Sequence, residues 1–109
     1  MGRGWHERMT LELIPWAERD TPTESALRRR LIAEGFDATP WSDPPHRTYA
    51  PHRHDHDESL WCVHGAITFR IDGSDYRLGP GDRLMLPRGT VHAATAGADG
   101  ATYLIGEKG

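Results

Sequence analysis

The stretch HRHDHDESLWCVHG, residues 52–65, holds four of the chain's seven histidines and its only cysteine. A surface has no need of such a cluster, and a core would have to desolvate every ring nitrogen in it. A divalent metal ion would account for the cluster, because neutral imidazole is the commonest metal ligand among side chains. We therefore expect this stretch to carry most of a metal site.

The spacing of three residues supports this interpretation. His52 and His54 lie two apart, so on an extended strand both side chains point to the same face. Glu58 has the same parity and can join them if the chain continues or bends back through residues 55–57. A fourth ligand must come from elsewhere, and the candidate is His92, in the stretch GDRLMLPRGTVH.

These residues resemble the two motifs of the cupin family. The first motif is similar to His52-x-His54-x-x-x-Glu58, six residues and Gly65. The second is similar to Gly81, five residues, Pro87-x-Gly89, two residues and His92. The resemblance extends from about residue 51 to residue 92, under half of the chain. It implies a metal ion bound by His52, His54, Glu58 and His92. An asparagine is often found in the family where this chain has Ala96, and that position does not bind the metal.

Three imidazoles and one carboxylate suit Zn, Fe, Ni, Mn, Co or Cu, and the sequence does not choose among them. We expect one divalent transition metal ion per chain. With six coordination, four protein ligands would leave two positions for water, oxygen or a small polar molecule. Such open positions distinguish catalytic from structural metal sites.

Other residues near the cluster have two interpretations each. His56 could replace His54 or Glu58 as a ligand, line the entrance, or lie in a solvated loop; the last two are favoured because the motif needs no fifth ligand. The candidates for a pocket wall, each of which could instead be core, are Leu60, Cys62, Phe69, Met85 and Ala94, with Trp61 and Tyr103 as further candidates. His6, His46 and His64 are expected at the surface.

The overall composition restricts the function. The formal net charge of −3 argues against nucleic acid as a general partner, and one cysteine excludes an internal disulfide. No apolar run approaches the ~18 residues of a membrane span. The N-terminal stretch MGRGWHERMT lacks the apolar region of a secretory signal. We expect a cytoplasmic protein whose partners are a small-molecule ligand and a second copy of itself, with neither nucleic acid nor membrane.

The pattern of short apolar segments bounded by Gly or Pro predicts an all-β protein. The resemblance implies a single-domain jelly-roll (cupin) β-barrel over residues 1–109, with an N-terminal strand and one short N-terminal α-helix within 9–35 and the barrel core at about 36–106. We expect Thr21 to cap the helix, Pro22 to occupy its first position, and an apolar stripe of Leu27, Leu31 and Ile32. The run Arg28–Arg30 is expected to be solvated, with a docking face as the alternative.

Strands are expected around 36–41 and 47–54. Residues 60–71 should form two strands hinged at Gly65, and Asp72–Gly73 a hairpin turn. Further strands are expected at 76–78, 83–86, 91–95 and 101–105, with a turn at 97–100. The edges that an open jelly roll leaves would favour a homodimer, and the N-terminal strand could cover one of them.

Two classes of function remain open. In the first, the metal acts as a Lewis acid or oxygen-binding centre; the resemblance implies dioxygenases, isomerases and decarboxylases as candidates. In the second, the protein is a non-catalytic binding or sensing module. This second interpretation rests on the lack of other catalytic groups: no Ser–His–Asp set, no lysine and no tyrosine can be placed beside the metal from the sequence, and the only lysine is Lys108. A purely structural metal is a third and weaker possibility.

Overall fold

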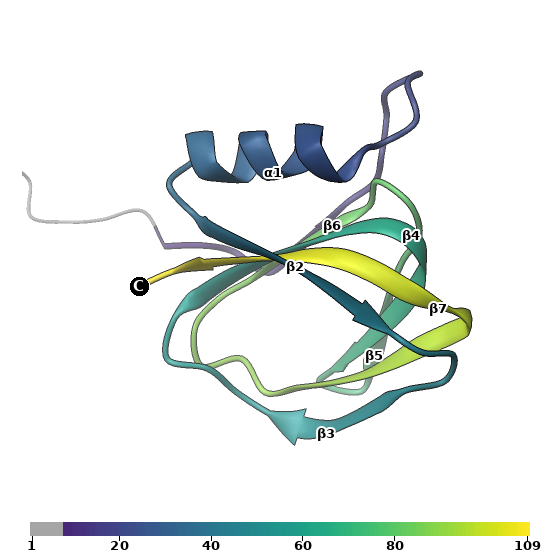
Figure 1. The fold of residues 1–109 in the computed structure, drawn as a ribbon. Helices are drawn as coiled ribbons and strands as arrows, with labels where there is room; N and C mark the ends of the chain where they lie inside the picture. The colour runs from purple at the N-terminus through teal and green to yellow at the C-terminus, as the bar shows by residue number, and fades with distance from the viewer. Residues whose placement is uncertain (1–7) are drawn as a thin grey trace, which may run out of the picture.

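The computed structural model describes residues 8–109 and confirms an all-β jelly-roll barrel with one helix beside it (Figure 1). Its elements are β1 (Glu12–Ile14), α1 (Glu24–Ala33), β2 (Asp37–Asp43), β3 (Thr48–His52), β4 (Asp57–Ile71), β5 (Ser74–Leu78), β6 (Arg83–Leu86) and β7 (His92–Lys108). All strand pairings are antiparallel. No helix within residues 8–109 is long and apolar enough to cross a membrane.

The barrel is built on two long strands, β4 and β7, that pair with each other and take part in both of its walls. The first half of β4 pairs with β6 and with the second half of β7, which also pairs with β2. The second half of β4 pairs with β5 and with the first half of β7, which also pairs with β3. The two strands therefore curve from one wall to the other (Figure 1).

Glycine permits this curvature. The β4–β7 register shifts between Cys62 and His64 and again between Gly65 and Ile67, which marks bulges that bend the ladder. Gly65 has φ 71° and faces Gly100, which has φ 77°. A Cβ on Gly65 would lie 2.1 Å from the carbonyl oxygen of Gly100, so only glycine fits this crossing. The expected hinge at Gly65 is thus a bend inside one strand, and the expected turn at 97–100 lies inside β7.

The Asp72–Gly73 turn is confirmed, because Ile71 pairs with Ser74 across a two-residue loop. Both loop residues have positive φ, 54° and 81°, as a type I′ turn requires. The other expected strands occur, with ends displaced by a few residues.

The helix packs on the outside of the barrel (Figure 1). Leu27 and Leu31 are fully buried against Phe36, Trp61 and Leu104, as their spacing predicts. Two expectations for the helix were wrong. Thr23, not Thr21, is the N-cap and accepts a hydrogen bond from the amide of Ala26, so the helix begins after Pro22.

The second error concerns the apolar stripe of the helix. Ile32 is 54% exposed, because only the face that carries Leu27 and Leu31 meets the sheet. The basic run is partly engaged: Arg30 forms an ion pair with Glu18 and its guanidinium lies 5.8 Å from the Trp16 ring centroid. Arg28 and Arg29 are exposed.

Candidate metal centre

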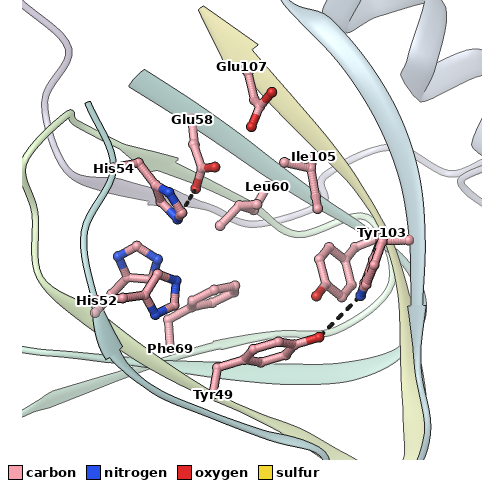
Figure 2. Close-up of a pocket in the computed structure, with 11 residues that line it drawn as sticks. Tyr49, His52, His54, Glu58, Leu60, Phe69, Tyr103, Ile105 and Glu107 are labelled. Carbon is pink, nitrogen blue, oxygen red and sulfur yellow. Dashed lines mark hydrogen bonds and ion pairs between the residues drawn. The ribbon is translucent and has the colours of Figure 1, made fainter. Parts of the chain in front are cut away.

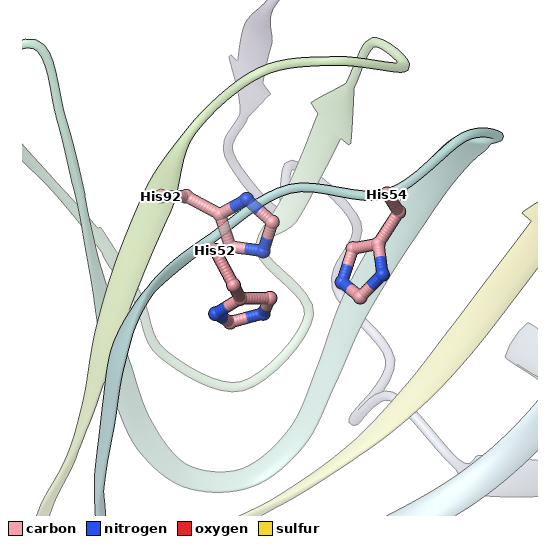
Figure 3. Close-up of side chains that lie close together, drawn as sticks. All are labelled: His52, His54 and His92. Atoms are coloured by element: carbon pink, nitrogen blue, oxygen red, sulfur yellow. The ribbon is translucent and has the colours of Figure 1, made fainter.

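Three histidine side chains converge inside one end of the barrel (Figure 3). His52 is the last residue of β3, His92 is the first of β7, and the two are direct partners across this ladder. His54 follows in the loop after β3. One ring nitrogen from each of the three lies within 4.8 Å of the other two, close enough that the three residues could hold a single metal ion.

Backbone carbonyls orient two of these rings. The Nδ1 atom of His52 lies 2.7 Å from the carbonyl oxygen of Ala50, and that of His92 lies 2.9 Å from the carbonyl oxygen of Thr90. Because a carbonyl only accepts, each Nδ1 must carry the proton, which leaves Nε2 with its lone pair free for a metal. Burial lowers the pKa of His92, although its bond to Thr90 acts in the opposite direction. The net effect is a lowered pKa, which favours the neutral ring that a metal requires.

The loop that carries His54 is held by the loop before His92. The amide of Gly89 donates to the carbonyl oxygen of His54 at 2.8 Å, and the amide of Arg88 donates to the Asp57 carboxylate at 2.9 Å. The Pro-x-Gly sequence of residues 87–89 thus has a structural role, since it ties the two histidine-bearing segments together.

Glu58 lies beside the three histidines but belongs to an overlapping group. It is 5% exposed, and its Oε1 lies 3.9 Å from Nε2 of His54. Its other oxygen accepts a hydrogen bond from His56 Nε2 at 3.2 Å. The same His56 nitrogen also lies 3.2 Å from an oxygen of Glu107. His54, His56 and Glu58 form a second group with metal-ligand spacing. His56 is thus half-buried and not solvated in a loop; it can act as a ligand, as one alternative expected, or as the hydrogen-bond donor that holds Glu58, a role the sequence did not indicate.

A cavity of about 250 Å³ opens beside the histidines (Figure 2). It is bounded by Trp41, Tyr49, His52, His54, Glu58, Leu60, Phe69, His92, Tyr103, Ile105 and Glu107. Leu60, Phe69 and Ile105 make its middle apolar, and polar groups lie at its two ends. This arrangement of an apolar wall with a few convergent polar groups is typical of small-ligand sites.

The end of the cavity remote from His52 and His54 is closed by a buried carboxylate. Asp43, at the end of β2, is 6% exposed and accepts hydrogen bonds from the hydroxyl groups of Tyr49 and Tyr103. Trp41 Nε1 lies 3.1 Å from the same carboxylate and 3.2 Å from the Tyr49 oxygen. Burial, and next the bond to Asp43, raises the pKa of Tyr103 far above its usual range, which keeps the phenol protonated.

The other predicted pocket residues lie outside this cavity. Cys62 is fully buried in the barrel core and Ala94 packs in the same cluster. Met85 and Trp61 face the opposite side of the sheet and pack under the helix, because their positions on β6 and β4 direct them outward. Leu60, Phe69 and Tyr103 do line the cavity.

The remaining histidines are peripheral or unplaced. His46 and His64 are exposed, and His6 lies outside the described residues. The sequence reasoning missed Trp41, Asp43, Tyr49, Ile105 and Glu107. The one available signal was the parity of β7, since Tyr103, Ile105 and Glu107 alternate along it.

Comparison with known proteins places the chain in a family. A profile of the cupin domain matches residues 41–105, more than half of the chain. The chain therefore belongs to the cupin family, as the two motifs indicate.

Individual relatives are more distant. Quercetin 2,3-dioxygenase of Bacillus subtilis (strain 168) is 42% identical over 43 residues, which cover 38% of this chain and only 13% of that protein. The solved structure of KdgF from Halomonas sp. is 28% identical, with a TM-score of 0.57 over 68% of this chain and 71% of that one. The polyketide cyclase RemF from Streptomyces resistomycificus, 22% identical, shares the fold with a TM-score of 0.60 over 70% of this chain and 58% of RemF.

Proposed function

We propose that this protein binds one divalent transition metal ion through His52, His54, His92 and Glu58 and presents it to a small polar molecule in the barrel cavity. The observation that carries the proposal is the convergence of three imidazoles within 4.8 Å at one end of a 250 Å³ cavity. When bound, the metal would supply Lewis-acid or redox chemistry through its open coordination positions.

The residues of the chain fit this ion. Two rings are held in the tautomer that presents Nε2, and the third is fixed through its backbone by Gly89. Glu58 would complete the set by a small movement away from His56, and its carboxylate would reduce the charge of the site. The metal is not assigned, because this donor set suits several first-row ions.

A metal-dependent enzyme is the favoured class, with dioxygenase and isomerase reactions as the candidates. The similarity to a short segment of quercetin 2,3-dioxygenase supports this choice, as does the cavity beside the ligands. Since the chain matches only 13% of that relative, its substrate is not transferred. The second candidate is a non-catalytic binding module, favoured by the lack of any lysine or arginine among the residues that line the cavity.

The experiment is metal analysis of untagged protein followed by turnover assays. We expect close to one metal ion per chain after purification, and either oxygen consumption or conversion of a small acid, thiol or diketone by the metal-loaded protein. Protein that binds no divalent ion at micromolar concentration would refute the metal site. Full metal loading without turnover of any compound in the panel would favour the binding module.

Two further properties belong to the proposal. The lone buried cysteine supports a cytoplasmic protein, since disulfides are rare in reducing compartments. Within residues 8–109 the short edge strand β1 pairs with β6 alone, and its other edge could pair with a second copy of the chain.

A further inference from the structure

The cavity has a second polar end that the proposed metal does not use. The hydroxyl groups of Tyr49 and Tyr103 form it, across the apolar middle from His52 and His54 (Figure 2), and Asp43 lies behind them as their hydrogen-bond acceptor. These groups come from three different strands, β2, β3 and β7. A ligand bound to the metal would extend toward them.

The hydrogen bonds at this end are directional. Each tyrosine donates its single proton to Asp43, so neither phenol has a proton left for a ligand. Each phenol oxygen still has lone pairs. Among the hydrogen bonds of residues 8–109, the Tyr103 hydroxyl donates to Asp43, whereas the Tyr49 oxygen also receives the Trp41 N–H. This end of the cavity therefore presents acceptors.

The charge of the lining points in the same direction. Glu58 and Glu107 line the cavity, Asp43 lies directly behind the two phenols, and the lining contains neither lysine nor arginine. The far end would repel an anionic group and leave it without a partner. A hydroxyl or amino group would instead donate to the phenol oxygens.

We propose that Tyr49 and Tyr103, with their protons held by Asp43, determine specificity by accepting a hydrogen bond from a hydroxyl or N–H group at the end of the ligand remote from the metal. This inference rests on the proposed function, since it takes the other end of the ligand to bind the ion.

The experiment uses simple metal-binding probes. Protein loaded with Co²⁺ is titrated with benzohydroxamate and with its 3-hydroxy, 4-hydroxy and 4-carboxy derivatives, and binding is followed in the visible spectrum of the ion. We expect one hydroxy derivative to bind about five- to tenfold more tightly than benzohydroxamate, as one net hydrogen bond allows. The carboxy derivative should bind more weakly than benzohydroxamate.

The variants are Tyr103→Phe and Tyr49→Phe, which remove one acceptor each and keep the ring. At least one should abolish the preference for the hydroxy probe while leaving the affinity for benzohydroxamate unchanged. Thr102→Val is the matched control. It also removes a hydroxyl group that joins β7 to β2, through a 3.1 Å hydrogen bond to Ser42, but Thr102 does not line the cavity. Thr102→Val should retain the preference.

The outcomes separate the two proposals. If benzohydroxamate binds to the ion but neither hydroxy derivative is preferred, or if both phenylalanine variants keep the preference, the inference is wrong and the metal site stands. If Co²⁺ itself does not bind, the proposed function fails and the inference fails with it. Variants that lose affinity for all probes equally would show that the tyrosines only support the barrel, which also overturns the inference.

Discussion

His52 and His92 are direct partners across the β3–β7 ladder, with ring centroids 4.3 Å apart, although forty residues separate them in the sequence. Each is the terminal residue of its strand, and each ring nitrogen Nδ1 is bonded to a carbonyl two residues earlier. The pairing therefore sets both the separation and the orientation of the two rings. A metal would enter a site whose geometry strand pairing has already fixed.

Replacement of either partner should remove most of the metal affinity. For His52→Ala and His92→Ala we expect the affinity for Zn²⁺ or Co²⁺ to fall on the order of 100-fold, because each variant lacks one ligand. Mutation of a residue that only hydrogen-bonds to a ligand already lowers metal affinity by about 10–100-fold. Isothermal titration calorimetry on metal-free protein measures the change. His64→Ala is the matched control, since this exposed histidine contacts none of the three rings. Equal affinity in His92→Ala and His64→Ala would contradict the assignment.

Mutation of Glu58 and of His56 distinguishes the two overlapping ligand groups, one formed by His52, His54 and His92 and the other by His54, His56 and Glu58. If Glu58 is the fourth ligand and His56 only donates to it, Glu58→Gln should lower metal affinity about 10- to 100-fold and His56→Gln by clearly less. The measurement is a competition titration of each variant against a chelating dye. A larger loss in His56→Gln than in His52→Ala would instead place the ion in the group formed by His54, His56 and Glu58.

The predicted metal ligands came from the spacing of the first motif and from the resemblance of both motifs to the cupin family, and the pairing of β3 with β7 brings the three histidines near one another. His52 and His54 converge although β3 ends at His52 and His54 lies in the loop after it, and His92 follows the Pro-x-Gly turn whose Gly89 amide bonds to the His54 carbonyl. The fold class followed from the same motifs. Residue spacing could not show whether Glu58 joins His54 and His92 in one metal site or joins His54 and His56 in another. That choice depends on the rotamers of these side chains.

The acceptor end of the cavity was not predictable from the sequence. Asp43 lies at the end of a proline-containing strand and precedes Pro44–Pro45, a position at which the sequence predicts a solvated loop. In the structure Asp43 is instead buried by Tyr49 and Tyr103. Its burial depends on β2 and β3 pairing with opposite halves of β7, which is a consequence of the bend in that strand. Met85 was misplaced because it points from β6 to the helix side of the sheet, whereas its neighbours Leu84 and Leu86 point into the barrel core.

Metal removal should destabilise the protein without unfolding it. The barrel has an apolar core of its own around Leu60, Ile67 and Leu84, so folding does not depend on the ion. At a free metal concentration of ten times Kd, binding adds about 1.4 kcal/mol, which corresponds to roughly 5–10 °C in Tm for a domain of this size. Differential scanning calorimetry with and without EDTA measures the shift. Loss of the folding transition on chelation would show a structural metal.

Cys62 should make stability fall at alkaline pH. Burial raises the pKa of this thiol to about 12, whereas an unfolded cysteine ionises near 8.5. Since the unfolded state then binds fewer protons, the stability from the neutral thiol is complete below pH ~8.5 and is lost as pH rises toward 12, on the order of 1 kcal/mol per pH unit. Urea unfolding of wild type and Cys62→Ala between pH 7 and 10.5 isolates this contribution. Parallel pH dependences for the two proteins would contradict it.

The crossing of Gly65 and Gly100 should tolerate no side chain. Gly65→Ala places a methyl group 2.1 Å from a backbone carbonyl oxygen at a residue with φ 71°, so both steric clash and left-handed strain act on it. Gly73→Ala is the matched control, because φ is 81° there but nothing lies within 4 Å of the added carbon. The control should lose about 1 kcal/mol, the cost of the backbone conformation alone. We expect the free energy of unfolding of Gly65→Ala, measured with urea, to fall by at least about 2 kcal/mol more than that of Gly73→Ala. The reason is that β4 and β7 cannot separate at this point without breaking the ladder that carries His92 into the cavity. Equal losses in the two variants would show that the bend is set by backbone conformation and not by close approach of the strands.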